Sequence, residues 1–471
     1  MSTRIGEASR DSAAGQNLLG ARYRVVFIAT MFTVCFFNFA DRAVFAVLAQ
    51  TIKQELLLTD FQIGILQGFS FALLYAGLGL PIGRLAERVS RVKIVACATL
   101  FWSAATACCG FASNFAQMML ARVGVGVGEA GFMPPTASLV SDHFPRERRA
   151  STMALIMLGT PAGLFFGSLI GGVVAGASGW RDSFFVLGAA GIVAGSLVFV
   201  VLREPSRGLV DGAAPTPRPP PAFGAFLREM RRKRALLLVT IGGGLAGFGM
   251  TSISQFLAVF LARAHHMPVR EAATYYGTIS AVSLMFGLLT GSFGTDLLAK
   301  RDGRWPAWGA AIGLCAAPFV YWVAFNTESK LAASVLLTAA GSVMLLFYGP
   351  TTAMIQNMLE PRMRATGAAL FGILYTLFGA GFGPTFVGWM SDRMAERAFA
   401  QGGFLTHCPA GLANATMSET LAQACRSAST AGVRGALMIA VCVLFAAGCV
   451  YLLAARWLRE NMYDPSSDGR A

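Results

Sequence analysis

Long apolar stretches recur along the whole sequence, and they limit the possible fold more than any other feature. A helix needs about 20 apolar residues to cross the hydrocarbon core of a bilayer. Only 13% of the residues are charged, whereas soluble domains contain about 25%. The sequence therefore predicts an all-α integral membrane protein with twelve transmembrane helices. We expect them near residues 24–49, 62–83, 94–115, 117–139, 151–176, 182–202, 235–262, 272–296, 305–325, 331–356, 365–391 and 435–456.

The distribution of basic residues predicts the topology. The net charge of +14 does not indicate nucleic-acid binding, because lysines and arginines collect in alternate loops. With the N-terminus in the cytoplasm, the short loops on the opposite side hold far fewer basic residues, namely Lys53, Arg181, Arg263, Arg270 and Lys330. This positive-inside bias predicts that both termini are cytoplasmic. We expect a multi-pass protein of the cell membrane, which is the inner membrane in a Gram-negative cell, with the lipid bilayer as its surroundings and no nucleic-acid partner.

A basic, proline-rich segment divides the predicted spans into two groups of six. Prolines at 215, 217 and 219–221 rule out a buried helix there and favour an extended linker. The predicted organisation is a cytoplasmic tail at 1–22, a six-helix bundle at 23–203, a cytoplasmic linker at 204–234, a second six-helix bundle at 235–457 with an outer loop at 394–433, and a cytoplasmic tail at 458–471.

The two halves resemble each other over one segment. PRERRASTMALIMLGTPAGLFFGSLIGG begins at Pro145, and PRMRATGAALFGILYTLFGAGFGPTFVG begins at Pro361. With a one-residue gap, Arg149 aligns with Arg364. Chance similarity between apolar stretches is the alternative, but the shared Pro-Arg start favours a repeat. A repeat that joins the fifth span to the eleventh resembles the two parallel six-helix repeats of major facilitator transporters.

The loop after the second predicted span resembles a signature of the same superfamily. GRLAERVSRVK, at residues 83–93, is similar to G-x-L-a-D-r-x-G-R-r, with Glu87 in place of the usual Asp and Ser90 in place of a Gly. Positive-inside charge is the alternative explanation, but it does not require an acid at Glu87. The resemblance implies a cytoplasmic gate of ion pairs, formed by Gly83, Glu87, Arg88 and Arg91.

The fifth predicted span resembles the glycine-proline motif of the superfamily. Its small residues recur at spacings of three and four, which lets helices pack closely and pivot. The expected hinge and packing residues are Gly159, Pro161, Gly163 and Gly167.

Four charged residues lie well inside apolar spans. Asp41 and Arg42 are in the first span, and Arg122 and Glu129 are in the fourth. Charge at such depth costs at least a few kcal/mol, so it usually serves a function. Arg122 and Glu129 are seven residues apart and share one helix face. We expect Asp41, Arg42 and Arg122 at one level, with Glu129 about 10 Å deeper.

Three motifs point to one group within the superfamily. FNFADR in the first span, ARVGVGVGEA in the fourth and the loop at Gly83 resemble spinster proteins, which move lysolipids and phosphorylated sphingoid bases. The Ala-, Gly- and Arg-rich composition suggests a bacterial source. In the facilitator fold the first and fourth spans line the central cavity, so the resemblance places all four charges where a substrate binds.

The expected function is proton-coupled secondary transport of an amphiphilic, anionic, lipid-like substrate by alternating access. Asp41 and Glu129 are the expected proton-coupling residues, and both act with Arg42 and Arg122 in substrate binding. Protonating one acid would release an arginine, whose fork of donors can bind a phosphate or carboxylate. The expected partners are therefore the small amphiphilic substrate and protons, and we expect a monomer.

Several alternatives stay open from the sequence. The four charges can instead be a neutral structural fastening between two spans. A multidrug or organic-anion/proton antiporter of the same superfamily is the main functional alternative. A membrane-embedded lipid enzyme is disfavoured, because the four histidines lie in loops or at span ends. No spacing suggests a metal site or a cofactor. Cys408 and Cys425 share the outer loop, where an oxidising compartment permits a disulfide.

Overall fold

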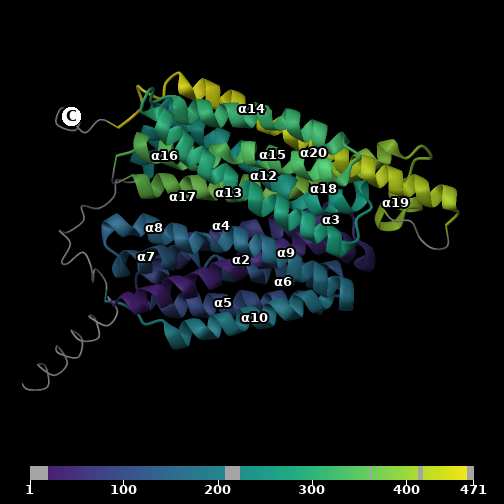
Figure 1. Cartoon of the computed structure of the whole chain (residues 1–471), viewed down its shortest axis with the longest axis horizontal. Helices are drawn as coiled ribbons and strands as arrows, with labels where there is room; N and C mark the ends of the chain where they lie inside the picture. The colour runs from purple at the N-terminus through teal and green to yellow at the C-terminus, as the bar shows by residue number, and fades with distance from the viewer. Residues whose placement is uncertain (1–19, 207–222, 361–362, 412–416, 464–471) are drawn as a thin grey trace, which may run out of the picture. The chain divides into compact units, whose positions relative to one another are not determined.

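The computed structural model describes residues 20–206, 223–360, 363–411 and 417–463. Every regular element within these ranges is a helix (Figure 1). By their contacts the described residues form two compact units. The first unit holds the chain up to Val44 and from Leu74 to the linker, and the second unit holds Phe45–Leu73 with the second half of the chain. Residues 45–73, which we expect in the first bundle from the sequence, group by their contacts with the second unit.

The helices of the first half follow one another with short connections. They are α2 (Ala21–Leu56), α3 (Asp60–Gln67), α4 (Phe69–Ala86), α5 (Arg91–Cys109), α6 (Phe115–Glu129), α7 (Met133–His143), α8 (Arg146–Met157), α9 (Gly159–Ser178) and α10 (Trp180–Val201). Within the first unit, α5 packs against both α6 and α10.

The second half begins with a short basic helix and ends with the longest one. Its elements are α11 (Phe223–Arg232), α12 (Arg234–Ala264), α13 (Val269–Ala299), α14 (Trp305–Asn326), α15 (Lys330–Met344), η1 (Leu345–Phe347), α16 (Tyr348–Met358), α17 (Arg364–Leu374), η2 (Tyr375–Phe382), α18 (Gly383–Ala398), α19 (Phe404–His407), η3 (Pro409–Gly411) and α20 (Glu419–Ala455). Within the second unit, α12, α14 and α18 all pack against α20.

Eleven helical segments among the described residues are long and apolar enough to cross a membrane. They correspond to the predicted spans except the fourth, at 117–139, which is divided between α6 and α7. The division falls at residues 130–132, just before Pro134 and Pro135 in the first turn of α7. Proline lacks an N–H group and restricts the residue before it, so a continuous helix through this point is unfavourable.

Glycines bring α9 into backbone contact with α2 in the first unit. A Cβ atom added to Gly159 would lie 2.7 Å from the carbonyl oxygen of Phe32, and one added to Gly167 would lie 2.5 Å from the Cα atom of Ala40. Gly163 is equally closed by Phe36 and Ala40. These positions therefore have no room for a side chain, as the predicted packing role requires. Pro161 lies in the first turn of α9, where its missing N–H costs no hydrogen bond.

The predicted internal repeat has a matching hydrogen bond in each half. Arg149 Nε donates to the carbonyl oxygen of Phe144 at 3.0 Å, and Arg364 Nε donates to that of Leu359 at 3.3 Å. Both acceptors directly follow a helix, α7 in one half and α16 in the other. Each arginine thus stabilises the C-terminal end of the preceding helix. This agreement supports the repeat.

Candidate functional site

The four charges of the apolar spans gather in the first unit. Arg42 donates two hydrogen bonds to one oxygen of Glu129, from Nε at 2.9 Å and from Nη2 at 2.5 Å. The Glu129 side chain is fully buried, and that of Arg42 is 25% exposed. The guanidinium group also faces the rings of Phe39 and Tyr75, with its central carbon 5.2 Å and 5.6 Å from their centroids. Aromatic faces stabilise a cation in such a position.

Asp41 is buried against α5. Thr106 of α5 donates a hydrogen bond from Oγ1 to Asp41 Oδ2 at 3.0 Å. Arg122 is also buried, and its charge interacts with both Asp41 and Glu129. Helices α2, α5 and α6 therefore hold two acids and two bases together, with a net charge of zero.

The pairing differs from the expected arrangement in one respect. The sequence places Glu129 below the other three residues, whereas the structure makes it the direct partner of Arg42. Glu129 is the last residue of α6, and the Arg42 guanidinium group reaches it. Helix depth counted from the sequence gives the Cα positions but not the direction of a long side chain.

Each carboxylate of this cluster keeps one oxygen without a hydrogen bond. Asp41 Oδ1 and Glu129 Oε1 are buried, and neither accepts a hydrogen bond from the residues that the structure describes. Burying an unsatisfied charged oxygen is costly. A protonated carboxyl group at either position would carry no charge, so its burial would cost less.

The loop at residues 83–93 makes ion pairs, but not the expected ones. Arg91 forms ion pairs with Asp142 and, at 2.8 Å from its Nε, with Glu204. Within the described chain, Glu87 and Arg88 are exposed and no ion pair involves Glu87. The expected pairing of Glu87 is therefore not seen among the described residues, and the gate role of this loop stays a prediction. Arg91 instead reaches acids on α7 and after α10, which lie far away in the sequence. Gly83 lies near Pro134, which is 3.9 Å from where its Cβ would be.

Glu204 fixes the start of the linker segment to α5. Its carboxylate accepts hydrogen bonds from the Val92 backbone N–H at 2.9 Å and from Ser90 Oγ at 2.8 Å, in addition to the Arg91 contact. Burial alone would raise the pKa of Glu204, but these donors outweigh it and hold the pKa below its usual value. Glu204 therefore remains ionised at neutral pH.

A second buried charge cluster in the second unit was not predicted from the sequence. Asp60, at the first turn of α3, accepts hydrogen bonds from Lys53 at 2.5 Å, from Arg263 at 2.6 and 2.7 Å, and from Ser391 Oγ at 2.6 Å. Lys53, Asp60 and Arg263 are all buried. Asp392 adds a second acid, because its carboxylate accepts hydrogen bonds from the backbone N–H groups of Asp60 and Phe61 at 3.1 and 2.8 Å.

Lys53 and Arg263, which we expect in short outer loops from the sequence, lie in the last turns of α2 and α12. Both residues lie within helices, and their charges are neutralised by Asp60 rather than by water. The available signal was the presence of acids as well as bases at the predicted outer ends of the spans. Such end charges look the same in sequence whether they are solvated or paired.

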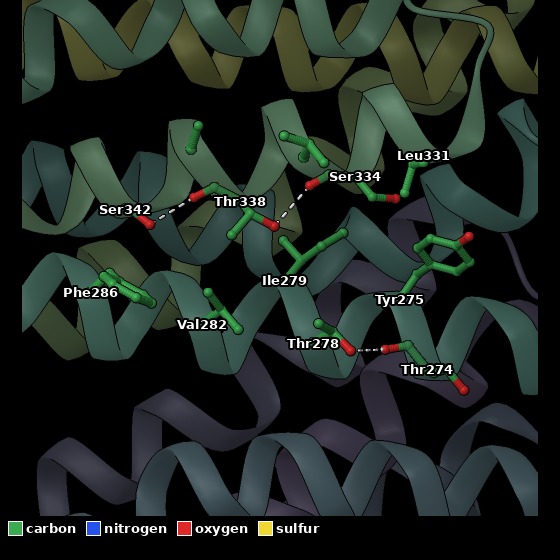
Figure 2. Close-up of a pocket in the computed structure, with 12 residues that line it drawn as sticks. Thr274, Tyr275, Thr278, Ile279, Val282, Phe286, Leu331, Ser334, Thr338 and Ser342 are labelled. Carbon is green, nitrogen blue, oxygen red and sulfur yellow. Dashed lines mark hydrogen bonds between the residues drawn. The ribbon is translucent and has the colours of Figure 1, made fainter.

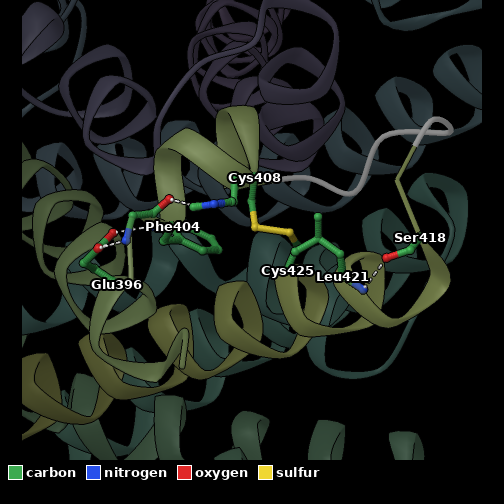
Figure 3. The surroundings of a disulfide bond; sticks show 8 residues. Glu396, Phe404, Cys408, Ser418, Leu421 and Cys425 are labelled. Atoms are coloured by element: carbon green, nitrogen blue, oxygen red, sulfur yellow. Dashed lines mark hydrogen bonds between the residues drawn. A yellow bond between two sulfur atoms is a disulfide. The ribbon is translucent and has the colours of Figure 1, made fainter. Parts of the chain in front are cut away.

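The segment between α18 and α20 contains a disulfide. Cys408 and Cys425 are joined, which fastens the turn after α19 to the N-terminal part of α20 (Figure 3). Both cysteines belong to a small buried cluster with Phe399 and Phe404. Glu396 accepts hydrogen bonds from the backbone N–H groups of Gly403 and Phe404 at 2.7 and 2.8 Å. The segment is therefore folded at these positions, and α20 extends 16 residues before the predicted span at 435.

Comparisons with known proteins agree with this architecture. The Major Facilitator Superfamily model matches residues 31–384. A protein named MFS-type efflux pump from Mycolicibacterium smegmatis is 32% identical over 365 residues, which cover 77% of this chain and 83% of that protein. The zebrafish (Danio rerio) protein named sphingosine-1-phosphate transporter SPNS2 is 23% identical over 377 residues, covering 76% and 74% of the two chains.

A solved structure extends the match to nearly the whole chain. The crystal structure of a bacterial homolog of the human lysosomal transporter Spinster, in an inward-facing and unoccupied conformation, aligns with a TM-score of 0.86 and 30% sequence identity. The alignment covers 95% of this chain and 100% of that one. The helices, the matched model and this alignment identify a multi-pass membrane transporter. The chain therefore belongs to the Major Facilitator Superfamily and, within it, to the spinster-like group.

Proposed function

We propose that this transporter is a proton-coupled secondary carrier of an amphiphilic, anionic, lipid-like substrate, of the lysolipid or sphingoid phosphate class. The observation that supports this proposal most strongly is the buried Arg42–Glu129 pair beside Asp41 and Arg122. A purely structural fastening can be made from serine and threonine at a lower insertion cost. Buried ionisable residues in a membrane protein instead mark substrate or proton pathways.

The proposed mechanism links one proton to the release of one arginine. A proton on Glu129 would remove the charge that holds Arg42 through two hydrogen bonds. The freed guanidinium group could then bind a phosphate or carboxylate through two parallel donors. Asp41 is the second proton site, and Arg122 is the second cation available to the headgroup. Proton binding and anion binding therefore favour each other through the same cluster.

The substrate class is supported by the cations and by the relatives. Drug efflux of cations would favour acids without paired arginines, whereas this cluster contains two arginines. The zebrafish relative is named as a transporter of sphingosine-1-phosphate, a molecule with a phosphate headgroup and an alkyl tail. An arginine fork suits that headgroup better than a lysine does.

The proposed topology has twelve spans in two six-helix bundles, 23–203 and 235–457, with α6 and α7 counted as one span. Basic residues in alternate loops support cytoplasmic locations for both termini, for the linker at 204–234 and for the tails at 1–22 and 458–471. The linker and the tails lie largely outside the described residues. We place the protein in the cell membrane as a monomer, with the segment 394–433 on the outer side.

We assign the two remaining ion-pair clusters to the two sides of the membrane. Arg91 with Asp142 and Glu204 would form the cytoplasmic gate, and the cluster around Asp60 would form an outer latch. Each cluster joins segments that are distant in sequence, so breaking it would free those segments to move. The close contact of α9 with α2 at Gly159, Gly163 and Gly167, beside Pro161, is the proposed pivot.

Transport into proteoliposomes under an imposed pH gradient tests the proposal. A panel of lysolipids and sphingoid phosphates is compared for wild type, Asp41→Asn, Glu129→Gln and Arg42→Ala. Both carboxylate variants should still bind an anionic amphiphile but lose the dependence on the pH gradient. Arg42→Ala should weaken binding by roughly 1.5–3 kcal/mol, the value of one hydrogen bond to a charged group. Glu419→Gln, which removes an exposed carboxylate on α20, is the matched control.

Two results would contradict the proposal. A wild-type pH profile in both carboxylate variants would exclude their coupling role. Lower stability with unchanged affinity and pH dependence would make the cluster a structural fastening.

A multidrug or organic-anion/proton antiporter is the second candidate. The observation that favours it is the 32% identity to a protein named as an efflux pump. The same panel separates the candidates when small organic cations and anions without long tails are added. Transport of tail-free compounds as fast as that of lysolipids would favour the antiporter.

A further inference from the structure

A long apolar groove lies between α13 and α15 in the second unit (Figure 2). Its cavity volume is about 510 Å³. Large apolar side chains along it remain uncovered by the described chain: Leu331 is 68% exposed, Val335 61% and Phe286 54%. Water would be an unfavourable occupant of such a surface.

The serine and threonine hydroxyl groups that line the groove bond within their own helices and are not available as donors to a ligand. Thr278 donates its hydroxyl proton to the Thr274 carbonyl oxygen at 2.9 Å, and Thr338 donates to that of Ser334 at 2.8 Å (Figure 2). Ser342 does the same toward Thr338 at 2.8 Å. In each case the acceptor is the carbonyl group four residues earlier in the same helix. The donors are therefore already used, and the groove offers mainly methyl and methylene groups to a ligand.

The groove has a defined end and a defined length. Lys330 and Glu271 form an ion pair at 3.0 Å that joins the N-terminal turns of α15 and α13, so both helices start at the same end. Tyr275 lies near this end, and tyrosine is enriched where a membrane meets water. From Thr274 to Phe286 the helix rises about 18 Å, and one leaflet of the hydrocarbon core is about 15 Å thick.

We propose that this groove binds one alkyl chain of a bilayer phospholipid whose headgroup lies at the N-terminal ends of α13 and α15. The apolar walls and the length of one leaflet fit a single chain. Arg270 is exposed at the same end. Since Glu271 balances Lys330, Arg270 supplies the net positive charge that complements a lipid phosphate. The transported substrate is disfavoured as occupant, because no buried, unbalanced charge lines the groove. This inference is independent of the proposed substrate.

Photocrosslinking from inside the groove tests the proposal. Benzoylphenylalanine is introduced at Val335 in the groove or at Val323 on α14, which is 47% exposed and lies outside it. The full-length protein is irradiated in native membranes, and adducts are identified by mass spectrometry. Position 335 should yield several times more phospholipid adduct than position 323. Ala339→Phe, which fills the groove, should reduce that adduct to the level of position 323, whereas Ala339→Ser should not.

Three outcomes would overturn the proposal. Equal adducts at the two positions would mean an ordinary lipid shell. An undiminished adduct in Ala339→Phe, and in Thr278→Phe as a second blocking variant from the opposite wall, would mean that the chain lies elsewhere. Displacement of the phospholipid by an added lysolipid would mean that the groove belongs to the transport pathway. Arg42→Ala should impair transport but keep the phospholipid adduct at position 335. The adduct therefore tests the groove separately from the transport mechanism.

Discussion

The Arg42–Glu129 pair predicts a large energetic coupling between two substitutions. Arg42→Ala would leave the fully buried Glu129 carboxylate without the two hydrogen bonds at 2.5 and 2.9 Å. Removing one partner of a buried ion pair costs about 3–5 kcal/mol. Because the Arg42 side chain is 25% exposed, we expect the lower value, about 3 kcal/mol.

The reverse substitution should cost less. Glu129→Gln leaves Arg42 beside two aromatic rings and partly exposed, so we expect a loss of about 1–2 kcal/mol, similar to that of a hydrogen bond. The double variant leaves neither charge unpaired at this point. Its loss should therefore be smaller than the sum of the single losses, by about 2–3 kcal/mol.

The assay is unfolding of the four proteins by SDS in mixed micelles, measured at several pH values. The deficit of Arg42→Ala should shrink at lower pH, because a proton on Glu129 removes the unpaired charge. Matched substitutions at the exposed Arg88 provide the baseline for losing an arginine. If the losses in free energy of unfolding of the two single variants add up to that of the double variant within about 0.5 kcal/mol, the coupling on which the mechanism depends is refuted.

Four further predictions concern other parts of the chain. Asp60→Asn leaves two buried cations facing each other and should lower the free energy of unfolding by about 3–5 kcal/mol; wild-type thermal stability would contradict the cluster. Replacing both Cys408 and Cys425 by alanine should cost about 3 kcal/mol for a loop of this length, and wild type in reductant should then behave like the variant. Glu204 has a lowered pKa, so it contributes stability above about pH 4.3 that is lost as the pH falls through its folded pKa. Glu204→Gln should flatten that acid slope in a stability–pH profile, and an unchanged slope would exclude the role. A cysteine at Ala213, which lies outside the described residues, should react with an impermeant thiol reagent only in broken or inverted vesicles, and labelling of intact cells would reverse the topology.

The sequence was most informative at positions where a residue is costly to place in a membrane. Charges inside apolar spans are expensive wherever they occur, so Asp41 and Glu129 could be recognised from the sequence as candidate site residues. The glycines that contact α2 could also be recognised, because only their spacing mattered. These inferences depend on local composition and on helix periodicity, which a sequence displays directly.

The partners of long side chains were not predictable in the same way. Arg91 pairs with Asp142 and Glu204, which are 51 and 113 residues away, rather than with the nearby Glu87. Asp60 was missed because a charge at the end of an apolar segment costs little if water reaches it. Only the packing of α3 against α18, together with Arg263 of α12, shows that water does not reach it. Composition alone therefore could not give the ion-pair partners of Arg91 or the burial of Asp60, and the tertiary contacts were needed for both.

The zero net charge of the cluster around Arg42 and Glu129 has a bioenergetic consequence. Moving one elementary charge across a potential of 100 mV involves about 2.3 kcal/mol. If one proton and one singly charged anion are bound together, the loaded cluster is still neutral, and the membrane voltage does no work on its transit. A doubly charged phosphate would need two protons for the same balance, and Asp41 and Glu129 supply two acceptors. Such a carrier would be driven by the pH difference alone, and its cargo would distribute independently of the electrical potential.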